Sequence, residues 1–152
     1  MAQVLAPDPT SFAPLAPERL ERWSAFPDMG QPMFGSLIGL VLEEVREDYA
    51  RMRLPWRPEL TQPAGVMHGG AISTLIDTVV VPAIAGAYDD RPVMLTLNLD
   101  VSFLGAVRDE DAVAEGWITR RGRSVVFCEA LVRTASGAPA ARGSLVYSIR
   151  VP

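Results

Sequence analysis

The stretch that decides the fold is Gln62-Pro63-Ala64-Gly65-Val66-Met67-His68-Gly69-Gly70-Ala71-Ile72-Ser73-Thr74-Leu75-Ile76-Asp77. A polar amide is followed by a glycine-rich turn, which leads into an apolar helix with one acidic residue, Asp77, on its third turn. An aspartate among apolar side chains is costly to desolvate unless it is paired or used. A Gly-Gly pair at a helix start exposes backbone N–H groups that can point at a developing negative charge. Together the two features are typical of half of an acyl-transfer site.

The composition limits the class of protein. The chain has 152 residues, of which 49% are hydrophobic, enough for one domain with a substantial core. No uncharged apolar run approaches the ~20 residues that a bilayer span needs, and no basic residue precedes the first apolar stretch as in a signal peptide. We therefore expect a cytoplasmic protein with no membrane partner. Residues 1–16 are rich in Pro and Ala and predict a flexible arm, whereas 17–152 predict a single domain.

Charged and metal-binding side chains exclude several further classes. All 14 basic residues are arginine, so no lysine is present for a P-loop, a Schiff base or a Ser-Lys dyad. A net charge of −4 without a basic block predicts no nucleic-acid partner. Cys128 is the only cysteine and His68 the only histidine, which excludes an intrachain disulfide and predicts no metal site.

Hydrophobic periodicity predicts the order of the elements. We expect a helix over 17–23, strands over 37–45 and 49–54, a loop over 55–66, a helix over 68–87, and strands over 93–104, 111–120, 124–134 and 141–151. Pro82 inside the long helix predicts a kink one turn beyond Asp77. Consecutive strands with short links favour an antiparallel sheet, and one helix this apolar must be wrapped by it. The predicted class is α+β.

This element order, with His68-Gly69-Gly70 opening the long helix and Asp77 on it, resembles the hotdog-fold thioesterases. The most similar branch is the PaaI-like (phenylacetyl-CoA thioesterase) one, and the resemblance extends from about Gly35 to the C-terminus. It implies a hotdog fold, in which an antiparallel β-sheet is wrapped around one long central α-helix. It also implies an acyl-CoA substrate, of which coenzyme A is a part, and no separate cofactor.

The resemblance implies catalytic roles for four residues. Gln62 stands where the branch has an Asn or Gln, six residues before the histidine. Gly69 is expected to offer its N–H to the thioester carbonyl oxygen, and Asp77 to attack or to activate water. Thr96, on the strand after the helix, is expected to steady that water or the carboxylate.

The separation of Gly69 and Asp77 predicts a site shared between subunits. Eight residues on one helix span roughly 12 Å at ~1.5 Å per residue, whereas the reacting groups need contacts of about 3 Å. Two antiparallel helices can satisfy both requirements, with Gly69 of one chain facing Asp77 of the other. We therefore expect a homo-oligomer with a dimer as the catalytic unit, and the resemblance extends this expectation to a homotetramer.

Other residues are expected to contact the substrate. His68 and Gly70 adjoin the expected oxyanion donor, but His68 and Asp77 lie on opposite helix faces, so His68 is expected to hold the loop by hydrogen bonding rather than to act as a base. The cluster Arg120-Arg121-Gly122-Arg123 lies at a predicted hairpin turn, where basic side chains could bind the phosphates of coenzyme A. A solvated hairpin tip is the alternative interpretation.

The orientation of Thr96 is left open by the pattern. From Leu95 to Phe103 apolar and polar residues alternate, which places Thr96 on the face opposite to the leucines. If the apolar face covers the central helix, Thr96 points away from it. Either a site of the partner subunit lies over that other face, or a β-bulge redirects Thr96.

The set of Gln62, Gly69 and Asp77 matches the needs of thioester hydrolysis, which are a polarised carbonyl, a carboxylate and water. The predicted function is hydrolysis of an acyl-CoA thioester, with an aromatic or medium-chain acyl group, to the free acid and coenzyme A. Hydratase relatives of the fold need a catalytic histidine paired with an acidic residue, and the only histidine here belongs to the Gly-Gly motif. A non-catalytic acyl-CoA-binding hotdog protein is one alternative, and a purely structural sheet protein is another.

Overall fold

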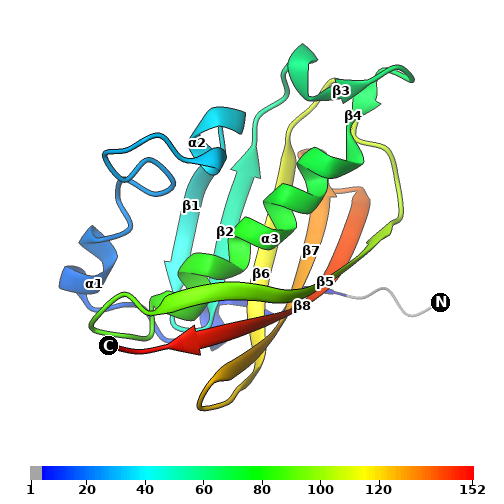
Figure 1. The fold of residues 1–152 in the computed structure, drawn as a ribbon. Helices are drawn as coiled ribbons and strands as arrows, with labels where there is room; N and C mark the ends of the chain where they lie inside the picture. The colour runs from blue at the N-terminus through cyan, green and yellow to red at the C-terminus, as the bar shows by residue number, and fades with distance from the viewer. Residues whose placement is uncertain (1–4) are drawn as a thin grey trace.

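The structure is a computed structural model that describes residues 5–152 (Figure 1). Six strands form one antiparallel sheet in the order β1-β2-β6-β7-β8-β5. They are β1 (Val41–Arg46), β2 (Tyr49–Leu54), β5 (Val93–Phe103), β6 (Ala112–Arg121), β7 (Val125–Thr134) and β8 (Pro139–Arg150). The predicted antiparallel sheet is confirmed. β1 and β5 are its two edge strands.

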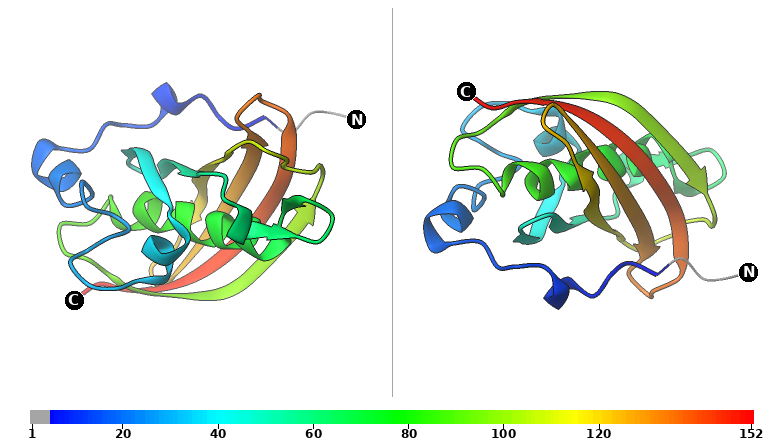
Figure 2. Two further views of the ribbon diagram at one scale, coloured as in Figure 1. Left: turned by 90° about the horizontal axis from the view of Figure 1, so that it is seen from above. Right: turned by 90° about the horizontal axis from the view of Figure 1, so that it is seen from below.

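One long helix, α3 (Gly69–Ala85), lies across the inner face of this sheet. Figure 2 shows the strands curving around it. Its apolar side chains Leu75, Ile76, Val79 and Val80 are fully buried, because they face the sheet rather than solvent. The predicted α+β architecture, a sheet wrapped around one central helix, is confirmed. The helix continues through Pro82 as far as Ala85, so the hydrogen bond that proline cannot donate belongs to the last turn.

Two glycines let α3 lie close to the sheet. A Cβ atom added at Gly143 on β8 would come within 2.6 Å of Cγ2 of Ile76. A Cβ atom added at Gly116 on β6 would come within 2.8 Å of Cγ1 of Val79. Neither distance is compatible with an unchanged core, so the depth at which the helix is embedded depends on these glycines.

The chain before α3 differs from the sequence prediction in two places. Leu37 and Ile38, which were expected to begin the first strand, instead end a short helix, α2 (Phe34–Ile38), and Gly39 follows it in a left-handed conformation with φ 81°. The expected loop over 55–66 contains a 3-10 turn (Pro58–Leu60) and a two-stranded ribbon of β3 (Thr61–Gln62) and β4 (Val66–Met67). The first predicted helix is confirmed as α1 (Pro17–Glu21).

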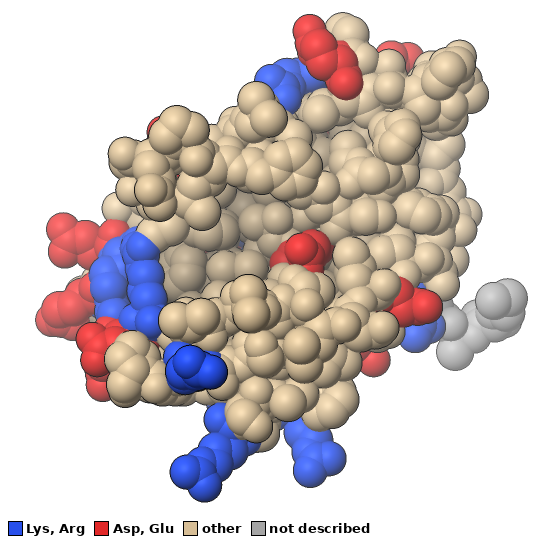
Figure 3. All heavy atoms as spheres, in the orientation of Figure 1, with Lys and Arg blue, Asp and Glu red and all other residues tan. Residues whose placement is uncertain are grey.

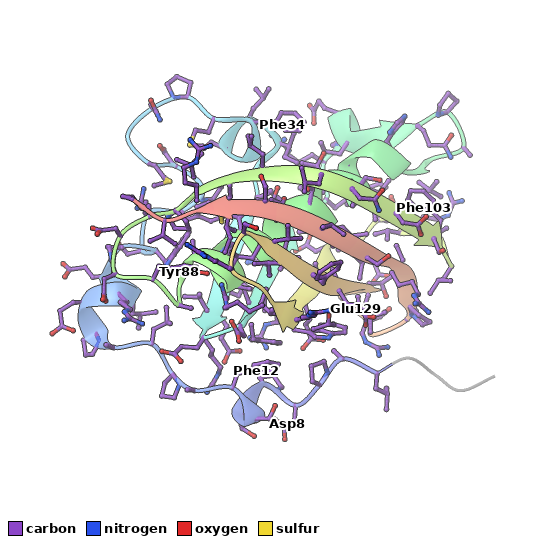
Figure 4. All side chains as sticks on the ribbon, turned by 60° about the horizontal axis from the view of Figure 1, so that its bottom comes forward. Asp8, Phe12, Phe34, Tyr88, Phe103 and Glu129 are labelled. Carbon is purple, nitrogen blue, oxygen red and sulfur yellow. The ribbon has the colours of Figure 1, made fainter. Side chains whose placement is uncertain are left out.

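The N-terminal arm packs on the outer face of the sheet. Residues 1–4 of it lie outside the described residues, and a 3-10 turn spans Pro9–Ser11. The ring of Phe12 stacks on that of Tyr49 with 5.2 Å between centroids. Figure 4 shows Phe12 on the opposite side of the sheet from Phe34 and Phe103. The arm therefore covers part of the face that α3 does not.

None of the helices in the described part of the chain is long and apolar enough to cross a membrane.

Candidate active site

The first turn of α3 leaves one backbone donor unused. His68 is the N-cap, and its Nδ1 accepts a hydrogen bond of 2.8 Å from the N–H of Gly70. The N–H groups of Ala71 and Ile72 donate to the main-chain oxygen of His68. Within residues 5–152, only the N–H of Gly69 in this turn has no hydrogen-bond partner. A free N–H at the positive end of a helix is a donor suited to a carbonyl oxygen that gains negative charge.

The histidine of the motif is thus used by the helix itself. An Nδ1 that accepts a hydrogen bond carries no proton, which places the proton of the neutral ring on Nε2. This agrees with the expectation that His68 holds the loop by hydrogen bonding. No hydrogen bond joins His68 to Asp77 in the described part of the chain.

Phe103, at the end of β5, lies against the helix start. A Cβ atom added at Gly69 would come within 3.1 Å of Cζ of Phe103, although the Phe103 side chain is 55% exposed. Glycine at this position therefore makes room for an aromatic ring beside the free N–H. Phe103 was not among the site residues that the sequence predicted.

The carboxylate of Asp77 is held by two hydroxyl groups. Its Oδ1 accepts hydrogen bonds of 3.0 Å from Oγ1 of Thr96 and of 2.6 Å from the hydroxyl of Tyr147. The Tyr147 hydroxyl is also 2.7 Å from the main-chain oxygen of Asp77. The structure thus brings Asp77 and Thr96 together, and it adds a tyrosine that the sequence prediction missed.

Tyr147 could have been found from the alternation of β8. Leu145, Tyr147 and Ile149 are buried on the face that packs against α3, and the residues between them are more exposed. A buried tyrosine hydroxyl needs a hydrogen-bond partner, and Asp77 is the only acidic residue on α3. Burial, followed by the hydrogen bond to Asp77, raises the pKa of Tyr147 above its ordinary value. The hydroxyl therefore stays protonated and can donate.

A β-bulge explains how Thr96 reaches the helix. Thr96 pairs with Tyr147 and Asn98 pairs with Val146, so Leu97 is an extra residue in β5. Thr96 therefore faces α3 together with Tyr147, while the next inward residue is Leu99, which pairs with the buried Leu145. The alternation from Leu95 to Phe103 therefore does not describe one face of the sheet. The bulge at Leu97 exchanges the two faces, so the inward residue is Thr96 before the bulge and Leu99 after it.

Gln62 lies in the ribbon that precedes the helix. Its Oε1 accepts a hydrogen bond of 3.1 Å from the N–H of Ala64, and its main-chain oxygen accepts one from Gly65. Gly65 has a φ of 69°, a conformation that favours glycine. In the described residues Gln62 makes no hydrogen bond to Asp77 or Thr96, so its predicted role at the substrate stays a prediction.

The arginine cluster divides into two kinds of side chain. Arg121 points inward, where it forms an ion pair with Asp48 and donates hydrogen bonds to the hydroxyl of Tyr88 and the main-chain oxygen of Ile84. Arg120 and Arg123 are exposed at the hairpin, whose turn is closed by a hydrogen bond from Gly122 N–H to the oxygen of Val125. Binding of the coenzyme A phosphates by this cluster therefore stays a prediction. Within the cluster, Arg120 and Arg123 are the exposed side chains that could make that contact.

The surroundings of Asp77 are mainly uncharged. Figure 3 shows an acidic patch over the middle of α3 with uncharged surface around it. Residues 5–152 contain no group of three or more His, Cys, Asp or Glu side chains that could hold a metal ion. The chemistry that the described groups offer is that of a carboxylate, hydroxyl donors and one backbone N–H.

Residues 64–141, half of the chain, match the family model described as the thioesterase superfamily. The chain belongs to the thioesterase superfamily. The matched segment contains Gly69, Asp77 and Thr96. An esterase-named protein of Halobacterium salinarum is 33% identical to this chain over 105 residues, which are 65% of this chain and 68% of the relative.

Solved structures show the same fold as this superfamily member. A conserved protein of Pseudomonas aeruginosa, PA5202, is 26% identical with a TM-score of 0.74 and matches 79% of this chain and 95% of its own. The PaaI protein of Escherichia coli, from the phenylacetic acid degradation operon, is 12% identical with a TM-score of 0.79. The match covers 90% of this chain and 96% of the PaaI chain. The predicted hotdog fold is confirmed.

Proposed function

We propose that this protein is an acyl-CoA thioesterase that hydrolyses an aromatic or medium-chain acyl-CoA to the free acid and coenzyme A. The observation that carries the proposal is the pair of groups on α3: an unused N–H at Gly69 and a carboxylate at Asp77 whose Oδ1 is held by two hydroxyls. The first can polarise a thioester carbonyl and the second can act on water or on the carbonyl carbon. Membership of the thioesterase superfamily supports the reaction class.

In the proposed reaction the carbonyl oxygen of the thioester accepts the hydrogen bond of Gly69 N–H. In one route Asp77 takes a proton from the attacking water, the C–S bond breaks, and that proton passes to the sulfur of the leaving coenzyme A. In the other route Asp77 attacks the carbonyl carbon, the C–S bond breaks and coenzyme A leaves as its thiolate; water then hydrolyses the mixed anhydride, which releases the free acid, restores Asp77 and supplies the proton of the thiol. The two groups lie eight residues apart on one helix, roughly 12 Å at ~1.5 Å per residue. The proposed site therefore combines Gly69 of one subunit with Asp77 of the partner subunit.

The edge strand β5 supports the proposed dimer. It is 11 residues long, and no other strand within residues 5–152 pairs with its outer edge. Four of its side chains are more than half exposed: Val93, Leu95, Leu97 and Phe103. A long apolar edge strand favours pairing with another chain, because pairing satisfies its backbone groups and buries its side chains. A second copy of β5, running antiparallel, would continue the sheet across the dimer. The homotetramer is proposed as an association of two such dimers.

The nucleotide end of the substrate is proposed to lie near the β6–β7 hairpin. Arg120 and Arg123 are exposed there. A hollow of about 460 Å³ beside the hairpin is lined by Ser124, Ser148 and Arg150 together with apolar residues of β5. Guanidinium groups and hydroxyls are suited to phosphate oxygens.

The test is turnover of a panel of aromatic and aliphatic acyl-CoAs, with the released thiol measured by a thiol reagent. We expect hydrolysis of at least one member, and a loss on the order of 10³-fold or more in Asp77→Asn, which keeps the volume and removes the charge. Binding of acyl-CoA without turnover would instead indicate the non-catalytic alternative. Near-normal turnover by a folded Asp77→Asn variant would place the chemistry elsewhere.

Mixed oligomers test the shared site. Chains carrying Gly69→Pro lack the donor and chains carrying Asp77→Asn lack the carboxylate, so each parent is expected to be nearly inactive. A mixed dimer contains one site built from two unaltered halves, and we expect its activity to approach half of the wild type. Mixed dimers that form without recovering activity would contradict a site shared between subunits.

A further inference from the structure

The two oxygens of the Asp77 carboxylate are not equivalent. Oδ1 accepts hydrogen bonds from both Thr96 and Tyr147, at 3.0 and 2.6 Å. Oδ2 makes no hydrogen bond within residues 5–152. A carboxylate fixed at one oxygen cannot rotate freely about its χ2 angle, so its second oxygen keeps a constant direction.

Tyr147 is the more rigid of the two donors. It is 3% exposed and lies on β8, which is paired with β7 on one side and β5 on the other. Its hydroxyl contacts both the side chain and the main-chain oxygen of Asp77, so it fixes the carboxylate relative to the helix backbone. Thr96 belongs to the exposed edge strand, and its side chain is less constrained by packing.

We infer that Tyr147 is a positioning residue of the proposed thioesterase reaction, which holds Oδ1 of Asp77 so that Oδ2 is the oxygen presented to water or to the carbonyl carbon. This inference rests on the proposed function. Tyr147 acts only through Asp77, because the hydroxyl is directed at that residue and lies beneath the surface. The exposed Thr96 on edge strand β5 donates the second hydrogen bond to the same oxygen.

The chain contains a matched control for this tyrosine. Tyr49 is also fully buried, and its hydroxyl donates a hydrogen bond of 2.7 Å to a carboxylate oxygen of Glu115. Burial raises the pKa of Tyr49, as it does for Tyr147. The Tyr49 pair lies under the N-terminal arm on the outer face of the sheet, away from α3. Tyr49→Phe thus removes the same kind of bond without touching Asp77.

The experiment is a double-mutant cycle on kcat and KM with the best acyl-CoA of the panel. We expect Tyr147→Phe to lower kcat about tenfold with KM changed less than twofold, and Tyr49→Phe to leave both near wild type. In the Asp77→Asn background, Tyr147→Phe is expected to cause no further loss of the residual rate, because its target charge is gone. An equal tenfold loss in both backgrounds, or an unchanged kcat in Tyr147→Phe, would overturn the inference.

A second set of variants covers the event that Tyr147→Phe disturbs folding. Thermal unfolding identifies that case. Thr96→Val and Thr96→Ser then test the second hydrogen bond to Oδ1 of Asp77. Removal of the hydroxyl in Thr96→Val is expected to lower kcat severalfold, and Thr96→Ser, which restores it, to recover most of the rate. A Thr96→Ser variant no faster than Thr96→Val overturns the positioning of Oδ1. A wild type without any turnover refutes the proposed function itself, whereas an active wild type with an unaffected Tyr147→Phe refutes only this inference.

Discussion

Replacing Gly69 by proline and by alanine separates the role of its N–H from the role of its size. Gly69 is the first residue of α3, where proline is well tolerated, and its N–H has no partner to lose among the described residues. His68 has φ −64° and ψ 136°, an extended conformation that a following proline permits. Both variants add a Cβ atom that meets the Phe103 ring at 3.1 Å, so both require the same small shift of that ring. They differ in the N–H, which alanine keeps and proline removes.

The expected effect follows from the loss of one oxyanion donor. Such a loss lowers kcat by about 10²- to 10³-fold, or roughly 3–4 kcal/mol of transition-state stabilisation. We expect the kcat of Gly69→Pro to be lower than that of Gly69→Ala by about that factor. The free energies of unfolding of the two variants are expected to lie within ~1 kcal/mol of each other. The assay is thiol release from the best acyl-CoA, with thermal unfolding as the control for folding. A Gly69→Pro rate within threefold of Gly69→Ala, with both proteins folded, would refute the assignment of this N–H as the donor.

Two further variants and one property of the unaltered protein test the packing, the phosphate contacts and the burial of the cysteine. Gly143→Ala is expected to destabilise the protein by about 1–3 kcal/mol in thermal unfolding, because its Cβ atom would meet Ile76 at 2.6 Å; an unchanged melting temperature would show that α3 is not tightly packed there. Combined Arg120→Ala and Arg123→Ala is expected to raise KM severalfold for acyl-CoA but not for an acyl-N-acetylcysteamine thioester, which lacks the phosphates, and equal effects on both would argue against phosphate binding. Burial raises the pKa of the Cys128 thiol to about 12. We therefore expect the folded protein to add almost no background to the thiol assay at pH 8. Rapid labelling of Cys128 by the thiol reagent before unfolding would contradict its burial.

The strands and the central helix could be predicted because their patterns are long and periodic. β2 (Tyr49–Leu54) has the predicted bounds, β5 and β7 differ from the prediction by one residue at one end, and β6 is shifted by one residue at both ends. The five-residue helix α2 has no periodicity of its own, and its sequence continues into Leu40 and Val41 as one apolar run. That run is typical of a strand. Gly39 and Leu40 separate the two elements, and the left-handed conformation of Gly39 is not revealed by the sequence pattern.

The part of the candidate site that lies on one continuous segment of the chain could be predicted from the sequence. Gly69 and Asp77 lie on one helix, and their spacing is visible in the chain. Tyr147 is 70 residues from Asp77 and reaches it only through the pairing of β8 with β5 and β7, which one sequence does not specify. Arg121 was grouped with its neighbours because it adjoins them in sequence. The bulge between β6 and β7, after Ile118, is followed by an inward-facing Arg121 paired with the buried Val126.

The single extra residue in β5 divides that strand into two parts with different duties. Before Leu97, the inward residue Thr96 donates a hydrogen bond to the carboxylate on the third turn of α3. After Leu97, the inward residue Phe103 packs against Gly69 at the start of the same helix. Deleting one residue between Thr96 and Leu99 would remove the offset, and the strand could then keep only one of these contacts in place. The length of β5 is therefore as much a requirement of the site as the identity of its side chains, and redesign of this strand is constrained to substitutions.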